Sequence, residues 1–337
     1  MIKNDTFFRR FRRGLLGIFA WGLLTGCQQI ADRVSDWVAL ALAPPAPASL
    51  PVIFPDANDG PKPSPPTHVQ DCPDCPRLVM LPAGQVLMGS PEDEIGRDED
   101  ESPQRWQALP TMAMGQTEVT RAQWQAFERD TGYRAASGCL TRSPEGYVHE
   151  PHLGWRYPGF DQTGEHPVVC INWSDAQAYV QWLSRKTKQR YRLPTEREWE
   201  YAARAGVSAP YPWQGGVNRL CEHANGADAR LSLQRADLPA QNCDDGFPYT
   251  APVGSFSPNA WGLFDMHGNA MEWVEDCWTA QIPEATSQAT PLHCRSRVTR
   301  GGGWDLTPQY LRSAYRGKAS SINRGTAIGF RVVRQVP

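Results

Sequence analysis

Eight cysteines between residues 72 and 294 constrain the fold of this chain more than any other feature, because each disulfide would join two segments. An even number of cysteines in an exported chain is typical of a disulfide framework, although eight allow roughly a hundred pairings. Neighbour order favours three pairs, with the connectivity left open: Cys139–Cys170, Cys221–Cys243 and Cys277–Cys294. Cys72 and Cys75 favour a local disulfide; a redox pair or a zinc half-site is the alternative, and no second C-x-x-C pair supports it.

The N-terminus predicts the export that such disulfides require. Residues 1–13 contain five basic side chains and one Asp, and residues 14–26 follow without any charge. This is the pattern of a secretory signal peptide, and the apolar run is too short for a permanent membrane span. Leu24-Thr25-Gly26-Cys27 resembles a bacterial lipobox, so residues 1–26 are predicted to be removed and Cys27 to be lipidated. The alternatives are an uncleaved anchor or an ordinary signal with a chance cysteine.

A tether is predicted between the lipid and the folded domain. Nine prolines fall between Pro44 and Pro66, and such a segment is extended and packs no core. We therefore divide the chain into a lipidated tether, residues 27–70, and a domain, residues 71–337. Gln28 after the lipidated cysteine favours the outer membrane, with the domain on its periplasmic face or on the cell surface. Residues 12–16 also resemble a twin-arginine signal, which would mean export in the folded state.

Composition and periodicity give a coarse picture of the domain. The net charge of −2 argues against nucleic-acid partners. The 13 Trp, 29 Gly and 30 Pro favour a loop-rich fold with aromatic anchors. Short apolar runs predict strands at residues 78–81 and 86–88. Three helices are expected: one from Thr120, one with Ser174 as N-cap, and one opened by a capping box at Thr195 and closed by Gly206.

Long motifs then occur in a fixed order along the chain. They are EVT at 118–120, HPV at 166–168, WSDA at 173–176, RLPTEREWEYAAR at 192–204, GLFDMHGNAMEW at 262–273, RGG at 300–302 and GFR at 329–331. Through them, residues 78–334 resemble the formylglycine-generating enzyme (sulfatase-modifying factor) superfamily. The resemblance implies one α+β domain, a loop-rich variant of the C-type lectin fold braced by disulfides and calcium. Three tryptophans would anchor the core and three charged residues would bond internally to loops: Trp173, Trp199, Trp273, Glu200, Arg204 and Arg331.

The resemblance also implies two structural calcium sites. The first set has side-chain oxygens from Asn225 and Asp245 and backbone carbonyls from Gly226 and Phe247. The second set has carboxylates from Asp265 and Glu272 and backbone carbonyls from Gly268 and Ala270. Such hard oxygen donors suit Ca²⁺ better than zinc or copper. Asp, Asn and Gly are also turn formers, so ordinary turns are the alternative. The acidic run at residues 92–101 is interpreted as a solvated loop rather than a cation site.

Formylglycine-generating chemistry is not expected. The active enzymes of the family bind copper through two cysteines, and soft Cu(I) needs such thiolates. At the matching positions this chain has Leu306 and Leu311, and it has no cysteine after Cys294. Gly303 and Met271 also replace a serine and a tryptophan of the family motifs. No copper is expected, and the domain is predicted to be inactive in this reaction.

A metal-dependent oxidoreductase with an unrecognised site is kept as the alternative. Other members of the superfamily are iron enzymes, resembling ergothioneine sulfoxide synthases or a pyoverdine maturation factor. The helical domain and H-x-x-x-H-x-E pattern of the former are absent from this sequence. His149 and His152 form its only histidine cluster, and a surface loop is the preferred interpretation of that cluster.

The first prediction for function is a ligand- or protein-binding module whose partner is unidentified. Its surface is predicted to occupy the place of the active site, and its side chains are Trp304, Asp305, Tyr310, Arg312, Tyr315, Arg316 and Asn323. Residues 303–328 are rich in small polar residues and tyrosine, which form good binding surfaces. This composition also resembles the variable segment of proteins diversified by retroelements, as well as an ordinary exposed loop.

Overall fold

A five-stranded antiparallel sheet joins the two ends of the domain. The computed structural model describes residues 67–284 and 294–336, so the predicted signal peptide, Cys27 and most of the tether lie outside the described residues. The sheet has the order β1-β2-β5-β13-β8. In that order its strands are His68–Val69, Leu78–Leu81, Met112–Gly115, Val333–Gln335 and Tyr191–Arg192. β1 pairs with β2, so His68 and Val69 belong to this sheet.

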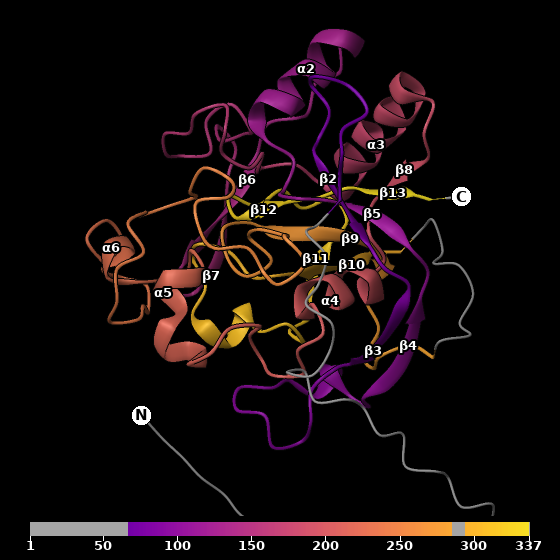
Figure 1. Ribbon diagram of the computed structural model, residues 1–337. Helices are drawn as coiled ribbons and strands as arrows, with labels where there is room; N and C mark the ends of the chain where they lie inside the picture. The colour runs from indigo at the N-terminus through magenta and orange to yellow at the C-terminus, as the bar shows by residue number, and fades with distance from the viewer. Residues whose placement is uncertain (1–66, 285–293, 337) are drawn as a thin grey trace, which may run out of the picture. The chain divides into compact units, whose positions relative to one another are not determined.

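A second sheet of four strands lies at the centre of Figure 1, where β9, β10 and β11 are grouped. Its order is β11-β10-β9-β12, with β12 parallel to β9 and the other pairs antiparallel. Its strands are Gly317–Ser320, Ser296–Arg300, Met271–Cys277 and Ile328–Gly329. This sheet brings the three C-terminal family motifs together, because β9, β10 and β12 each carry part of one.

Two hairpins complete the strands of the described residues. Gly84–Met88 (β3) pairs with Arg105–Leu109 (β4), and the helix Glu196–Arg204 (α4) packs against both strands. Cys139–Ser143 (β6) pairs with Gly146–Glu150 (β7). The strands predicted at residues 78–81 and 86–88 are confirmed, although they belong to different sheets.

Three longer helices begin at side-chain caps that satisfy the free backbone N–H groups of the first turn. They are Arg121–Thr131 (α2), Trp173–Thr187 (α3) and Glu196–Arg204 (α4), and Figure 1 shows α2 and α3 side by side. The capping boxes at Thr120 and Thr195 are confirmed. The N-cap of α3 is Asn172 rather than the predicted Ser174, because Asn172 and Asp175 cap each other reciprocally.

The end of helix α4 and five short helices differ from the sequence predictions. Helix α4 ends at Arg204, and its C-cap is Ala205 in the left-handed region, with φ 44°, one residue before the predicted Gly206. The sequence did not predict the short helices Glu99–Glu101 (η1), Gly216–Arg219 (η2), Leu220–His223 (α5), Ala229–Ser232 (α6) and Pro308–Leu311 (η3). Each has four residues or fewer, too few for a periodic pattern. In the described part of the chain, no helix is both long and apolar enough to cross a bilayer.

Four disulfides and a set of buried tryptophans fix the loops. The bonds are Cys72–Cys75, Cys139–Cys170, Cys221–Cys243 and Cys277–Cys294, the pairs that neighbour order favours. Trp199 and Trp273 are fully buried and Trp173 nearly so. Arg204 donates to the carboxylate of Glu200 and to the carbonyl of Gly89, as expected for a residue that holds a loop.

Candidate ligand-binding site

A cavity of about 280 Å³ opens between the hairpin β6–β7 and the C-terminal segment. It is lined by residues from both sides and from the central sheet: Leu140, Arg142, Tyr147, Met271, Thr299, Leu306, Tyr310, Tyr315, Gly317, Lys318, Ala319, Asn323, Gly325, Thr326, Ala327 and Ile328. Its floor is apolar and its walls carry phenol, guanidinium and amide groups. Such a mixture is typical of a site for a small ligand.

Backbone pairing holds the hairpin against the segment that forms the other wall. The N–H of Leu140 donates to the carbonyl of Arg324 at 2.6 Å, and the N–H of Thr326 donates to the carbonyl of Leu140 at 2.9 Å. The Cys139–Cys170 disulfide lies at the base of the hairpin, and the N–H of Cys170 donates to the carbonyl of Gly325. The position of the hairpin is therefore fixed by the segment that it covers.

Three tyrosines meet at the cavity. The rings of Tyr310 and Tyr315 pack edge to face, with centroids 5.1 Å apart. Desolvation and the nearby carboxylate of Asp305 raise the pKa of Tyr147 to about 12, and burial also raises the pKa of Tyr315. Both phenols are therefore neutral at physiological pH, and they offer O–H donors to a ligand.

Arg142 lines the cavity and donates a hydrogen bond to the hydroxyl of Tyr147, and its positive charge interacts with the carboxylate of Asp305. The Nε of Arg142 and both carboxylate oxygens of Asp305 are buried with no hydrogen-bond partner among the described residues. Burial raises the pKa of Asp305 to about 6, and the positive charges of Arg142 and Arg235 oppose that rise. Arg142 stands directly opposite Tyr147 in the register of the hairpin.

Three of the seven predicted surface residues line this cavity: Tyr310, Tyr315 and Asn323. The other four are buried, so the prediction of an exposed surface is wrong for them. Trp304 packs edge to face against the stacked rings of Phe160 and Tyr249 and donates from its indole to the carbonyl of Thr326. Asp305 is 2% exposed and lies outside the lining of the cavity.

Arg312 and Arg316 connect the C-terminal segment to the acidic run. Arg312 forms ion pairs with Glu94 at 2.5 Å and with Glu101 at 2.6 Å, and all three side chains are buried. Arg316 pairs with Glu196 at the start of α4 and donates to the carbonyl of Asp100. The interpretation of residues 92–101 as a solvated loop is therefore wrong in part, because two of its carboxylates neutralise a buried arginine.

The leucines at the copper positions of the family lie at or near the cavity. Leu306 lines it, and Leu311 is fully buried and contacts the backbone turn at Gly302. Met271, in place of the family tryptophan, also lines the cavity and accepts a hydrogen bond from Thr299. Every cysteine in the described residues is part of a disulfide. A thiolate is therefore lacking at this position in the described structure.

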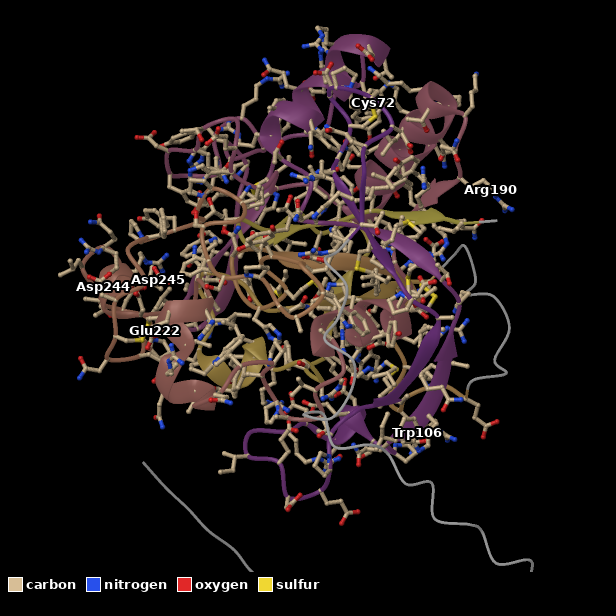
Figure 2. All side chains as sticks on the ribbon, in the orientation of Figure 1. Cys72, Trp106, Arg190, Glu222, Asp244 and Asp245 are labelled. Atoms are coloured by element: carbon tan, nitrogen blue, oxygen red, sulfur yellow. A yellow bond between two sulfur atoms is a disulfide. The ribbon has the colours of Figure 1, made fainter. Side chains whose placement is uncertain are left out.

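The first predicted calcium set comes together. Asn225 keeps its Oδ1 buried with no hydrogen-bond partner, and Asp245 accepts from the N–H groups of Gly226 at 3.0 Å and Phe247 at 2.8 Å. The Cys221–Cys243 disulfide joins the two halves, and Figure 2 shows Asp245 on the same flank of the molecule as Glu222. An orphan amide oxygen beside a carboxylate fits a hard cation.

The second predicted calcium set fits less well. Asp265 has a buried oxygen, Oδ1, without a partner. Glu272, however, accepts three hydrogen bonds from the guanidinium of Arg331 and one from the indole of Trp199. Because Arg331 already neutralises Glu272, this carboxylate is not available as predicted. Sequence reasoning also missed Glu118, which is buried beside Asp265 with both oxygens unpaired.

Sequence reasoning missed the hairpin wall as well. Leu140, Arg142 and Tyr147 carry no family motif and lie more than 150 positions from the C-terminal segment. His149 lies on β7, and His152 lies just after it, 3.6 Å from the carboxylate of Glu150. Within residues 67–284 and 294–336, no group of three His, Cys, Asp or Glu side chains is arranged to hold a metal ion.

Comparison with known proteins finds, along most of the chain, the family that the sequence motifs resemble. Residues 64–336 match the sulfatase-modifying factor enzyme 1-like domain family. The bovine formylglycine-generating enzyme is 31% identical over 82% of this chain and 77% of its own length. The mouse protein named inactive C-alpha-formylglycine-generating enzyme 2 is 32% identical over 70% of this chain and 76% of its own length.

Solved structures agree with the fold. PvdO from Pseudomonas aeruginosa superposes with a TM-score of 0.68 at 36% identity, covering 81% of this chain and 99% of PvdO. Treponema denticola variable protein 1 has a TM-score of 0.59 at 20% identity, covering 80% of this chain and 99% of its own, which shows a common fold alone. With its motifs, mixed α/β architecture and disulfides, this chain belongs to the formylglycine-generating enzyme-like (sulfatase-modifying factor) family.

Proposed function

We propose that this protein is a ligand-binding member of the family that makes no formylglycine. The observation that carries the proposal is the cavity: Leu306 lines it at a copper-ligand position, and three tyrosines surround it. Copper-thiolate chemistry requires free cysteines, and all described cysteines are in disulfides. The similarity to a mouse protein named inactive supports loss of this reaction within the family.

The experiment for this proposal combines metal analysis with an activity assay of the full-length protein. Calcium without copper or iron, and no oxidation of a sulfatase-motif peptide after incubation with copper, are the expected results. Stoichiometric iron or copper in the purified protein would instead support the oxidoreductase. Peptide oxidation that depends on copper would overturn the proposal directly.

The proposed setting is a membrane surface in an oxidising compartment. The basic and apolar N-terminus, the lipobox at Cys27 and the proline-rich tether support a lipoprotein held at the outer membrane. Four disulfides support export, because such bonds persist in oxidising compartments. Metabolic labelling with a radioactive fatty acid tests this, and a Cys27→Ala variant should lose the label.

We also propose calcium at the Asn225–Asp245 set, in a domain that is a variant of the C-type lectin fold. The chain's own residues would supply the Oδ1 of Asn225, the carboxylate of Asp245 and the carbonyls of Gly226 and Phe247. The cation would be structural and would neutralise a carboxylate that burial disfavours. Asp265 fits a second cation, whereas Glu272 does not.

If residues 303–328 are diversified, only part of the segment can vary without disturbing the fold. Side chains that anchor the fold interrupt the segment: Trp304, Leu306, Leu311, Arg312, Ala314 and Arg316 are all buried. Exposed or half-buried positions remain at Thr307, Gln309, Tyr310, Tyr315 and residues 318–324. If the segment is variable, changes should concentrate at these positions. A near-copy of its codons that differs at adenines, beside a reverse transcriptase, is the observation that tests the idea.

A further inference from the structure

The size of the cavity limits its ligand. Its volume of about 280 Å³ lies just below the range of roughly 300–1,000 Å³ that holds drug-sized molecules. A single ring with one short substituent fits such a space, and a peptide chain of several residues does not. The floor of Leu140, Met271 and Ile328 with the rings of Tyr310 and Tyr315 suits an aromatic group.

The polar groups of the walls point to a ligand that accepts hydrogen bonds. Neutral phenols at Tyr147 and Tyr315, the amide of Asn323 and the guanidinium of Arg142 all provide donors. Within residues 67–284 and 294–336 the hydroxyls of Tyr310 and Tyr315 make no hydrogen bond, so these groups are available to a ligand. Hydrogen-bond donors on the walls of an apolar space are the arrangement that recognises an oxygen-rich head group.

The charge of the lining has one sign. Arg142 and Lys318 are the charged residues that line the cavity, and no carboxylate does. The ammonium of Lys318 lies 3.9 Å from the centroid of the Trp278 ring, which is outside the lining. Arg142 is thus the cation of the site, with a buried Nε that has no partner among the described residues. Asp305, whose negative charge interacts with Arg142, is not among the lining residues.

We infer that this cavity binds a small aromatic carboxylate, with the carboxylate at Arg142 and the ring between Tyr310, Tyr315 and the apolar floor. This rests on the proposed function, since it assigns a ligand class to the same cavity. A guanidinium pairs well with the planar carboxylate because two N–H groups can donate in parallel. The tyrosine hydroxyls would complete the hydrogen bonds of the carboxylate oxygens.

The test measures binding of benzoate and 4-hydroxybenzoate to the full-length protein by ligand-observed NMR and calorimetry. Benzamide and benzyl alcohol, which keep the ring but lack the charge, are the matched probes. We expect the carboxylates to bind about tenfold or more tightly than these neutral probes. Arg142→Gln should remove that preference, whereas Arg190→Gln, at an exposed position labelled in Figure 2, should leave it unchanged.

A second variant and the pattern of probe binding distinguish failure of this inference from failure of the proposed function. Tyr315→Phe should weaken benzoate by a few fold while the thermal unfolding midpoint stays unchanged, which shows that the fold is intact. If benzoate and benzamide bind equally well, and Tyr315→Phe weakens both, the inference of a carboxylate ligand is overturned. The proposed function as a ligand-binding protein would then still stand. Binding of neither probe, together with stoichiometric copper or iron, would overturn both the inference and the proposed function.

Discussion

The arginines and the tyrosines of the C-terminal segment alternate along one stretch of chain but have different tasks. Arg300, Arg312, Arg316 and Arg331 are buried, and each pairs with a carboxylate on another element. Tyr310 and Tyr315 line the cavity instead. The difference shows that this segment is both the anchor of the loops and the wall of the site, and that neighbouring residues are divided between the two tasks.

Substitutions of the buried arginines and of the cavity tyrosines should have very different effects on the free energy of unfolding. Removing one partner of a buried ion pair leaves an unpaired charge in a medium that solvates it poorly. Removing a hydroxyl that faces a cavity leaves water to replace the lost contact. Stability measurements should therefore report on the arginines, and ligand binding should report on the tyrosines.

The largest effect is expected for Arg331→Ala. Its guanidinium neutralises the fully buried Glu272 and donates to the carbonyls of Gly115 and Phe264. Loss of a buried partner costs about 3–5 kcal/mol. Urea denaturation at neutral pH measures this cost. A loss below about 1 kcal/mol would show that the buried network is not what holds the segment.

Arg312→Ala should cost about 3 kcal/mol, because it leaves Glu94 and Glu101 unpaired. The acidic run should then open, so proteolytic cleavage within residues 92–101 should become faster. Arg190→Ala, at an exposed position, is the matched control. Unchanged cleavage in the Arg312 variant would mean that the run is held by other contacts.

Asp305→Asn should stabilise the protein above pH 6. Burial raises the pKa of Asp305 to about 6 from 3.8, so the folded state holds a proton that the unfolded state releases between these values. Stability from the neutral acid is present below about pH 4 and is lost as pH rises to about 6, by about 3 kcal/mol in all. Denaturation curves from pH 4 to 7 should show this slope in the parent and not in the variant.

Calcium should stabilise the fold through Asp245 and not through its neighbour. At a hundredfold excess over its dissociation constant, the ion adds about 2.7 kcal/mol, which a chelator removes. Asp245→Asn should weaken this response. Asp244→Asn should keep it, because Asp244, labelled beside Asp245 in Figure 2, pairs with Arg230 at the surface. Identical responses of the two variants would place the ion elsewhere.

Tyr310→Phe should have the smallest effect on stability, below about 0.5 kcal/mol, because its hydroxyl makes no contact within the described fold. Binding of an aromatic carboxylate should still weaken by a few fold. Urea denaturation and calorimetry on the same sample give both values. A stability loss like that of Arg312→Ala would place Tyr310 among the anchors and blur the division between the two groups.

Local signals in the sequence determined much of this protein. The capping boxes at Thr120 and Thr195 predict the start of two helices, because a cap depends on three or four consecutive residues. The disulfide pairs follow neighbour order, since each joins cysteines that are adjacent along the chain. Family motifs predicted the mixed α/β fold and the leucines at the copper positions.

Only the tertiary structure decided which residues form the site. Arg142 and Tyr147 carry no motif, and they reach the cavity because Leu140 pairs with a segment almost two hundred residues away. The sequence placed Arg312 and Arg316 on a surface, since arginine is seldom buried without a partner. Their partners, Glu101 and Glu196, come from distant elements. Burial of a charge depends on contacts across the fold, which a local pattern of residues does not contain.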